Sequence, residues 1–354
     1  MRSIDPGGKI DPPARVGSAA VDLGRTLVLI VTCLSLITTP ALSVSVGDAL
    51  GTSRAGLDDR SAPAMAGPNV ITSDDQLNWT RFGNDSQNTG HLATVGPRSN
   101  PRAKWSFTTG ANALSSPVIA GDTVYVTSTF DTNVFAINRT TGEKMWTFDR
   151  SGSFYAPPTY SDGILYVTGG TKVYALNATS GDVLWNTTIT SGSTTFSSPA
   201  VVNGTLYVGD DDDLHAIDAS TGKRLWNRSL GNWTAPDDWI SSSPAVANGT
   251  VYIGAGSNLV AFDASTGSFR WNYTANGYVG TPAIADGTVL GASCDDGVFA
   301  VNASTGRQKW NVSTEGCPST PSVANGTVYV GAYADYNDPR GFVYAFDAET
   351  GETV

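Results

Sequence analysis

The sequence predicts an all-β fold made of radially repeated, four-stranded antiparallel blades, which is a β-propeller. Six tryptophans recur at intervals of 41, 39, 41, 45 and 39 residues. A period near 40 with strand-like content is typical of units that must stack on their neighbours to bury an apolar face. Turn signals separate short β-rich runs within each unit, which leaves almost no residues for helices. The tryptophans are Trp105, Trp146, Trp185, Trp226, Trp271 and Trp310.

The third unit shows why four strands are expected in each blade. Residues 199–202 and 205–208 are β-rich runs on either side of Asn203-Gly204, a pair whose positive φ angles suit a tight hairpin. A third run and a second turn follow, and the last run carries Trp226. We therefore name the expected strands A to D, starting from the Ser/Thr-Pro pair that opens each unit. A glycine occupies the first turn of the other units too, at Gly121, Gly163, Gly249, Gly287 and Gly326.

The repeated motif resembles that of a known family. It reads Ala-x-(Asp/Asn)-x-x-(Thr/Ser)-Gly-x-x-x-Trp, first from Ala136 to Trp146, then over 175–185, 216–226, 261–271 and 300–310. It is similar to the tryptophan-docking motif of the PQQ-type (pyrroloquinoline quinone) β-propeller repeat family, and the resemblance covers residues 78–354. It implies that each tryptophan packs flat against the turn of an adjacent blade, and so has a structural role rather than a ligand role.

The two ends of the repeat region suggest how the ring closes. The sixth unit stops at Val354, one residue before its tryptophan would fall, while residues 103–108 have the sequence of a fourth strand without the first three. We expect 103–108 to complete the last blade, which would close a monomeric six-bladed ring and remove its open sheet edges. The alternative is a fragment of a seven- or eight-bladed relative.

The charge balance of the chain indicates which kinds of partner it can bind. The chain has 32 acidic and 21 basic residues, a net charge of -11, and six lysines. An acidic, lysine-poor surface argues against nucleic-acid binding, which requires clustered positive charge. The composition is similar to that of proteins from salt-loving archaea, and an ordinary acidic secreted domain is the alternative.

The N-terminal region predicts an extracellular or cell-surface protein. Residues 26–46 carry no charged side chain and form either a signal peptide or an uncleaved membrane anchor. A polar segment, 1–25, precedes them, a flexible linker is expected over 47–76, and the propeller is expected over 77–354. Membrane contact is thus expected only through the N-terminal segment.

Thirteen Asn-x-Ser/Thr triplets, each a possible glycan acceptor in a secreted chain, support that location. Three of them coincide with hairpin turns, where asparagine suits the backbone conformation. We expect some to carry glycans and most to be turn-forming. They begin at Asn78, Asn84, Asn138, Asn177, Asn186, Asn203, Asn227, Asn232, Asn248, Asn272, Asn302, Asn311 and Asn325.

Two of the three cysteines are placed to form a disulfide. Cys294 falls in the expected B-to-C loop of the fifth unit, and Cys317 falls in the D-to-A loop that follows. Antiparallel alternation brings both loops to one face of the ring, and a disulfide is permitted outside the cell. Two free thiols are the alternative.

The loops that vary in length mark a candidate binding face. The A-to-B and C-to-D turns are short and uniform, whereas all length variation lies in the B-to-C and D-to-A loops, where binding residues usually gather. We call these the uniform face and the variable face. The acidic run 210–213 lacks the spacing of a known calcium loop, so no metal site is expected there. The candidate face comprises Asp210, Asp211, Asp212, Asp213, Trp233, Asp237, Asp238, Trp239, Asp295, Asp296, Tyr333, Asp335, Tyr336 and Arg340.

Two functions fit this sequence. The favoured one is a non-enzymatic scaffold at the cell surface that binds a protein or glycan partner and needs no cofactor. The alternative, implied by the family resemblance, is a dehydrogenase that oxidises alcohols or sugars with PQQ and Ca²⁺. That chemistry needs a base beside a metal-bound quinone. No carboxylate stands out as such a base, and no two cysteines are adjacent as in many of the family's enzymes. No catalytic residue is assigned, and His215 fills a strand position that indicates a structural role.

Overall fold

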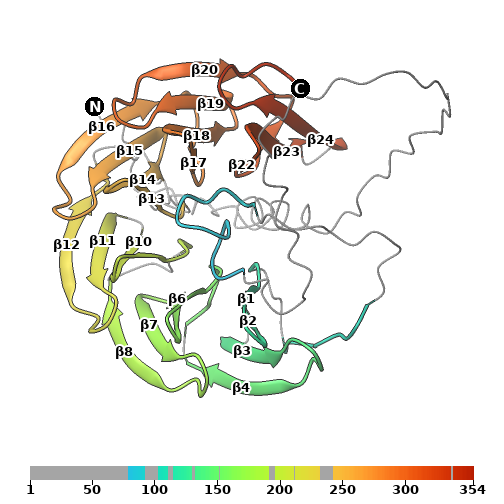
Figure 1. The fold of residues 1–354 in the computed structure, drawn as a ribbon, viewed down its shortest axis with the longest axis vertical. Coiled ribbons are helices and arrows are strands. Elements are labelled where there is room, and N and C mark those ends of the chain that lie inside the picture. Colours follow the sequence, from blue (N-terminus) through green and yellow to red (C-terminus); the bar gives the residue numbers. More distant parts are fainter. Residues whose placement is uncertain are drawn as a thin grey trace, which may run out of the picture.

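The computed structural model describes residues 79–91, 103–110, 115–129, 132–150, 152–190, 196–210, 212–231, 242–335 and 338–354. These residues contain strands and turns but no helix. The strands form six antiparallel sheets that follow one another around a common axis (Figure 1). The predicted all-β, blade-like architecture is therefore confirmed.

Five sheets are simple four-stranded meanders in chain order, and the sixth has a split inner edge. In the sixth sheet β21 and β22 pair with different parts of the same side of β23, and β24 pairs with the other side. The inner strands A are short and the outer strands D carry the docking tryptophans. The strands are β1 (Val118–Ala120), β2 (Thr123–Thr127), β3 (Asn133–Asn138), β4 (Lys144–Asp149), β5 (Thr159–Ser161), β6 (Ile164–Gly169), β7 (Lys172–Asn177), β8 (Val183–Thr188), β9 (Ala200–Val202), β10 (Thr205–Gly209), β11 (Asp213–Asp218), β12 (Arg224–Ser229), β13 (Ala245–Ala247), β14 (Thr250–Ala255), β15 (Asn258–Asp263), β16 (Phe269–Thr274), β17 (Ala283–Ala285), β18 (Thr288–Ser293), β19 (Gly297–Asn302), β20 (Gln308–Val312), β21 (Cys317–Pro318), β22 (Ser322–Ala324), β23 (Thr327–Asp335) and β24 (Asp338–Asp347).

A docking contact of one kind joins each of the first five blades to the next, and joins residues 103–110 to the first blade. The indole Nε1 of each repeat tryptophan donates a hydrogen bond of 2.8 to 3.1 Å to a backbone carbonyl in the following C-to-D turn. A glycine with positive φ lies directly under the ring, where a Cβ would come within 2.6 to 2.8 Å of the indole. In four junctions a tyrosine hydroxyl from strand B donates to the same carbonyl. The accepting carbonyls belong to Arg139, Ala178, Ala219, Ala264, Ala303 and Ala348.

In three units, the serine just before the Ser/Thr-Pro pair has a structural role. The hydroxyl of Ser197 accepts a hydrogen bond from the backbone N–H of Gly209 at 3.1 Å, and Ser242 accepts from Gly254 at 2.9 Å. Ser319 accepts from Gly331 at 3.2 Å. In each case a side-chain oxygen satisfies a strand B backbone donor near the variable face.

Residues 103–110 lie against the first blade. Trp105 docks on the β3–β4 turn, and the ring of Phe107 meets that of Phe135 edge to face at 5.3 Å. In the sixth sheet, Thr353 bridges Phe346 in the fourth-strand position. Among the described residues no pairing joins 103–110 to β24. Closure of the ring by residues 103–108 therefore stays a prediction.

Residues 79–91 form a strap that runs along the innermost strands at the centre of the ring (Figure 1). Trp79 pairs with Ile119 of β1, and the carbonyls of Thr80, Ser86, Gln87 and Thr89 accept from the backbones of β5, β13, β17 and β22. The Arg81 guanidinium donates to the carbonyl of Val201 in β9 at 2.9 Å. One short segment thus binds the inner strand of all six sheets.

Three of the regions named from the sequence, 1–25, 26–46 and 47–76, lie outside the described residues. Within the part of the chain that the structure describes, no helix has the length and apolar character needed to cross a bilayer.

Candidate functional site

On the variable face, the loop of the third blade is built around a buried Asp–His pair. Asp210 is 3% exposed and His215 is fully buried, with the Asp210 carboxylate 2.9 Å from the His215 Nε2. The other oxygen of Asp210 accepts from the backbone N–H groups of Asp212 and Asp213. Asp210, expected on the binding face, is therefore unavailable to a partner, because its carboxylate is committed to shaping its own loop. Asp212 is exposed, and the Asp213 carboxylate accepts from Asn227 at 2.7 Å.

A second cluster forms where the fourth, fifth and sixth blades meet. Cys294, directly after β18, and Cys317, in β21, form a disulfide with a Cα–Cα distance of 4.1 Å. The carboxylate of Asp296 accepts two hydrogen bonds from Asn276, from the backbone N–H at 2.8 Å and from the side-chain amide. Asp295 is exposed beside them. We call these five residues the acidic corner. Its loops are tied to three different blades, so its charges are held in place.

The remaining candidates do not join one patch. Tyr333 lies in β23 opposite Cys317, next to the acidic corner. The Arg340 guanidinium lies 5.8 Å from the ring centroid of Phe342 on β24. Among the described residues, no contact links the third-blade loop to the acidic corner. Asp211, Trp233, Asp237, Asp238, Trp239 and Tyr336 lie outside the described residues, as does the side chain of Asp335.

The uniform face carries a groove that the sequence did not reveal. It encloses about 650 Å³ between the third and fourth blades, bordered by the two A-to-B hairpins, the β15–β16 turn and the strap. Its polar lining includes Ser86, Gln87, Asn203, Asn248, Asp263 and Arg270.

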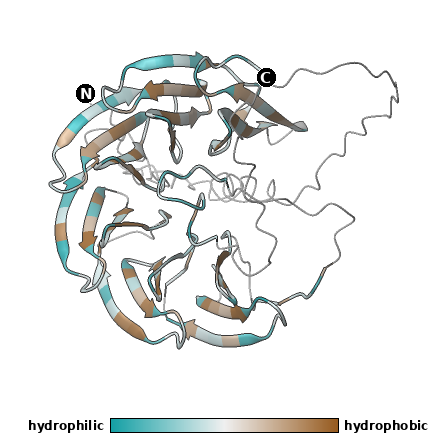
Figure 2. Cartoon of the chain, viewed as in Figure 1, coloured by the Kyte–Doolittle hydropathy of each residue, from teal (hydrophilic) through white to brown (hydrophobic). Residues whose placement is uncertain are grey.

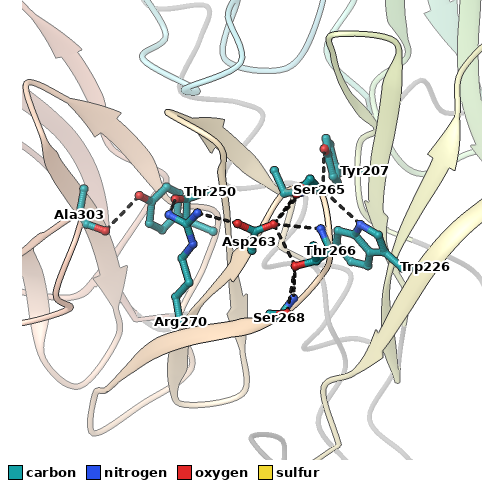
Figure 3. A network of polar contacts seen from close by, with 11 residues as sticks. Tyr207, Trp226, Thr250, Asp263, Ser265, Thr266, Ser268, Arg270 and Ala303 are labelled. Carbon is teal, nitrogen blue, oxygen red and sulfur yellow. Dashed lines mark hydrogen bonds and ion pairs between the residues drawn. The ribbon is translucent and has the colours of Figure 1, made fainter.

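An ion pair distinguishes this groove from the other junctions (Figure 3). The Arg270 guanidinium lies 2.7 Å from the Asp263 carboxylate and also donates to the hydroxyl of Thr250 at 2.5 Å. The hydrogen bond from Arg270, followed by those from Ser265 and Thr266, holds the pKa of Asp263 well below its usual range. The one sequence signal is that an arginine precedes Trp271 here, where the first three blades have Met145, Leu184 and Leu225. The groove offers hydrogen-bonding groups but no group poised as a nucleophile or base.

The fold accounts for the pKa shifts of the tyrosines and aspartates described next. Burial raises the pKa values of the inter-blade tyrosines, that of Tyr166 to about 12. Hydrogen bonds from the C-to-D turns lower the pKa values of Asp218 and Asp347. Within the described ranges no three His, Cys, Asp or Glu residues are grouped to hold a metal ion.

Four-stranded blades joined by tryptophan–glycine docking define a PQQ-repeat β-propeller. The chain belongs to the family described as outer membrane protein assembly factor BamB, whose model matches residues 74–312 and 231–354. No curated protein matches the chain.

Solved structures with similar folds include a BamB protein and two dehydrogenases. BamB from Moraxella catarrhalis is 22% identical with a TM-score of 0.55, over 66% of this chain and 72% of that one. A europium-containing methanol dehydrogenase is 14% identical with a TM-score of 0.61, over 78% and 77%. The quinohemoprotein alcohol dehydrogenase from Comamonas testosteroni is 16% identical with a TM-score of 0.64, over 80% and 67%. At these identities the likeness concerns the fold alone.

Proposed function

We propose that this protein is a non-enzymatic scaffold at the cell surface, and that a protein or glycan partner docks on its variable face at the acidic corner. The supporting observation is the construction of that corner. A disulfide joins its loops across two blades, and hydrogen bonds to Asp296 tie in a third. A surface held in one conformation loses little entropy on binding, which favours recognition.

The membership of the chain in the BamB-described family is consistent with a docking role. The corner presents carboxylates in a chain of net charge -11, so its partner is expected to offer positive charge or hydroxyl-rich sugar. Anchoring or export through residues 26–46 would place this face outside the cell.

Photo-crosslinking in cells tests the docking face. A photoreactive residue replaces Asp295 on the variable face, and the matched control replaces Asp182, an exposed residue of the β7–β8 turn on the uniform face. We expect a discrete adduct from position 295 and none from 182. The purified partner should then bind the wild-type protein and bind Asp295→Lys at least ten-fold more weakly. Equal crosslinking from both positions would contradict the proposal.

The alternative function is a PQQ-dependent dehydrogenase, favoured by the fold of two enzyme neighbours. The full chain is titrated with PQQ and Ca²⁺ in high salt, while quinone absorbance and the reduction of an electron-accepting dye with alcohols and sugars are followed. Saturable binding with turnover would replace the scaffold proposal. Absence of both, together with the position-295 adduct, would support it.

A further inference from the structure

We propose that Asn186, Asn227, Asn272 and Asn311 are N-glycosylation sites, and that they arrange a row of N-linked oligosaccharides along the outer rim of four consecutive blades. This inference rests on the extracellular location in the proposed function. It goes further by selecting four acceptors among thirteen triplets.

The four asparagines occupy equivalent places. Each directly follows a docking tryptophan on the outermost strand of its blade, in β8, β12, β16 or β20. Because successive side chains of a strand point to opposite faces, the buried tryptophan directs the asparagine outward, and the hydroxyl residue two positions later faces the same way. All four asparagines are exposed, and so are their hydroxyl partners Thr188, Ser229, Thr274 and Ser313. Both parts of the acceptor triplet thus face solvent. Figure 2 shows that these outermost strands carry hydrophilic residues between hydrophobic ones.

At the other acceptor triplets of the blades, the local backbone conformation explains why an asparagine is present, but it does not do so at these four positions. Asn203, Asn248 and Asn325 sit at hairpin turns with φ between 48 and 51°. The side-chain oxygens of Asn138, Asn177 and Asn302 each accept two backbone N–H groups of a C-to-D turn.

The rim asparagines have no such role in the fold. Asparagine is depleted in strands, so its recurrence at one strand position is not a matter of β propensity. Their contacts are with other side chains, and of the three partners named next only Asn258 is buried. Lys172 donates to Asn186 at 3.3 Å, Asn227 donates to Asp213 at 2.7 Å, and Asn272 donates to Asn258 at 3.2 Å. These contacts can be exchanged for water at little cost.

The modification requires a donor, which we identify by class as an oligosaccharide linked to a polyprenyl phosphate. The asparagine Nδ2 forms a bond to the anomeric carbon of the sugar as the bond from that carbon to the phosphate oxygen breaks. The lipid phosphate leaves with the electron pair, and the amide nitrogen gives up one proton. Only the side-chain amide and the hydroxyl two residues later need to be accessible, and both are.

The row would also protect the sheets. Strand D is the outer edge of each blade, and unpaired edge groups invite pairing with other chains. Sugars on four outer edges would cover them and leave the two faces of the ring for partners. The first blade has Thr147 in the equivalent position of β4, so it carries no rim sugar and serves as an internal reference.

The test uses the full chain, tagged at its C-terminus and purified from the cells that naturally produce it, after separation of exported and cytoplasmic fractions. Mass spectrometry of proteolytic peptides measures the occupancy of each asparagine. We expect most exported molecules to be modified at the four rim positions, with at least five-fold lower occupancy at Asn138, Asn177 and Asn302.

Two variants at one site complete the test. Thr188→Ala keeps Asn186 but removes its triplet, and should lose one glycan, whereas Thr188→Ser should keep it. Both should melt at the wild-type temperature, because Thr188 is exposed. Unmodified rim asparagines on exported protein would overturn the glycan row alone. A chain found only in the cytoplasm would overturn the proposed surface function as well.

Discussion

Replacing Gly306 by alanine tests whether tryptophan docking holds the blades together. Gly306 has a φ of +69°, and a Cβ there would lie 2.6 Å from Cε3 of Trp271. Gly287, in the other turn of the same blade, is a matched control. Its φ is +72°, but a Cβ there meets nothing within 4 Å. Gly287→Ala thus measures backbone strain alone, while Gly306→Ala adds displacement of the indole.

The expected magnitudes follow from these contacts. The left-handed conformation costs about 1–2 kcal/mol for either alanine. Overpacking against Trp271 adds about 1–3 kcal/mol. Weakening of the 3.0 Å bond from Trp271 to the carbonyl of Ala303 adds about 1 kcal/mol more. Gly306→Ala should therefore lose about 2–4 kcal/mol more than the control.

Urea unfolding followed by far-UV circular dichroism measures both variants. A third measurement repeats Gly306→Ala in a Trp271→Ala background, where its cost should fall to that of Gly287→Ala because the obstructing ring is gone. Equal losses for the two glycine variants in the wild-type background would show that Trp271 does not dock on the glycine, and would refute the reasoning.

Three more predictions concern other contacts. Ionisation of Tyr166 should destabilise the protein in alkali, because burial raises the pKa of its hydroxyl from 10.0 to about 12 in the folded state. The contribution of the neutral hydroxyl to the free energy of unfolding is complete below pH 10 and is lost as the pH rises to about 12. Tyr166→Phe should flatten the fall in melting temperature over that range, and an unchanged slope would contradict this. Asn88→Asp should destabilise the protein by about 3 kcal/mol. The Asn88 amide donates to the carbonyls of Pro244 and Pro282, and a carboxylate in its place would face both oxygens without a proton to donate. Calorimetry measures the loss, and Asn88→Gln is the control. Cys317→Ser should cost about 3 kcal/mol, as expected for a loop of this length, and an unfolding midpoint insensitive to reductant in the wild type would count against it.

Features repeated in the sequence were predictable because local chemistry determines them. An Asn-Gly pair specifies its own turn, and the glycine of each C-to-D turn specifies a left-handed conformation on which the tryptophan of another unit can lie. These signals depend on few neighbours, so six copies made the architecture readable.

Three features that arise once could not be predicted from the sequence. The burial of Asp210 depends on His215, five residues away, which looked like an ordinary strand residue. The groove at Arg270 depends on one arginine meeting a turn aspartate. The strap bonds largely through backbone carbonyls, which every residue possesses, so no side-chain pattern reveals its partners.

The strap also has a consequence for how the protein reaches its native state. The hydrogen bond from Val323 to Thr89 joins residues 234 positions apart, whereas the pairing of Trp79 with Ile119 spans only 40. Contacts so distant in sequence form slowly, because a long chain must first be ordered between them. Each blade can therefore assemble on its own local contacts, while the centre of the ring is completed only after the sixth inner strand has arrived. The first part of the domain to emerge during synthesis would be among the last to find all of its partners.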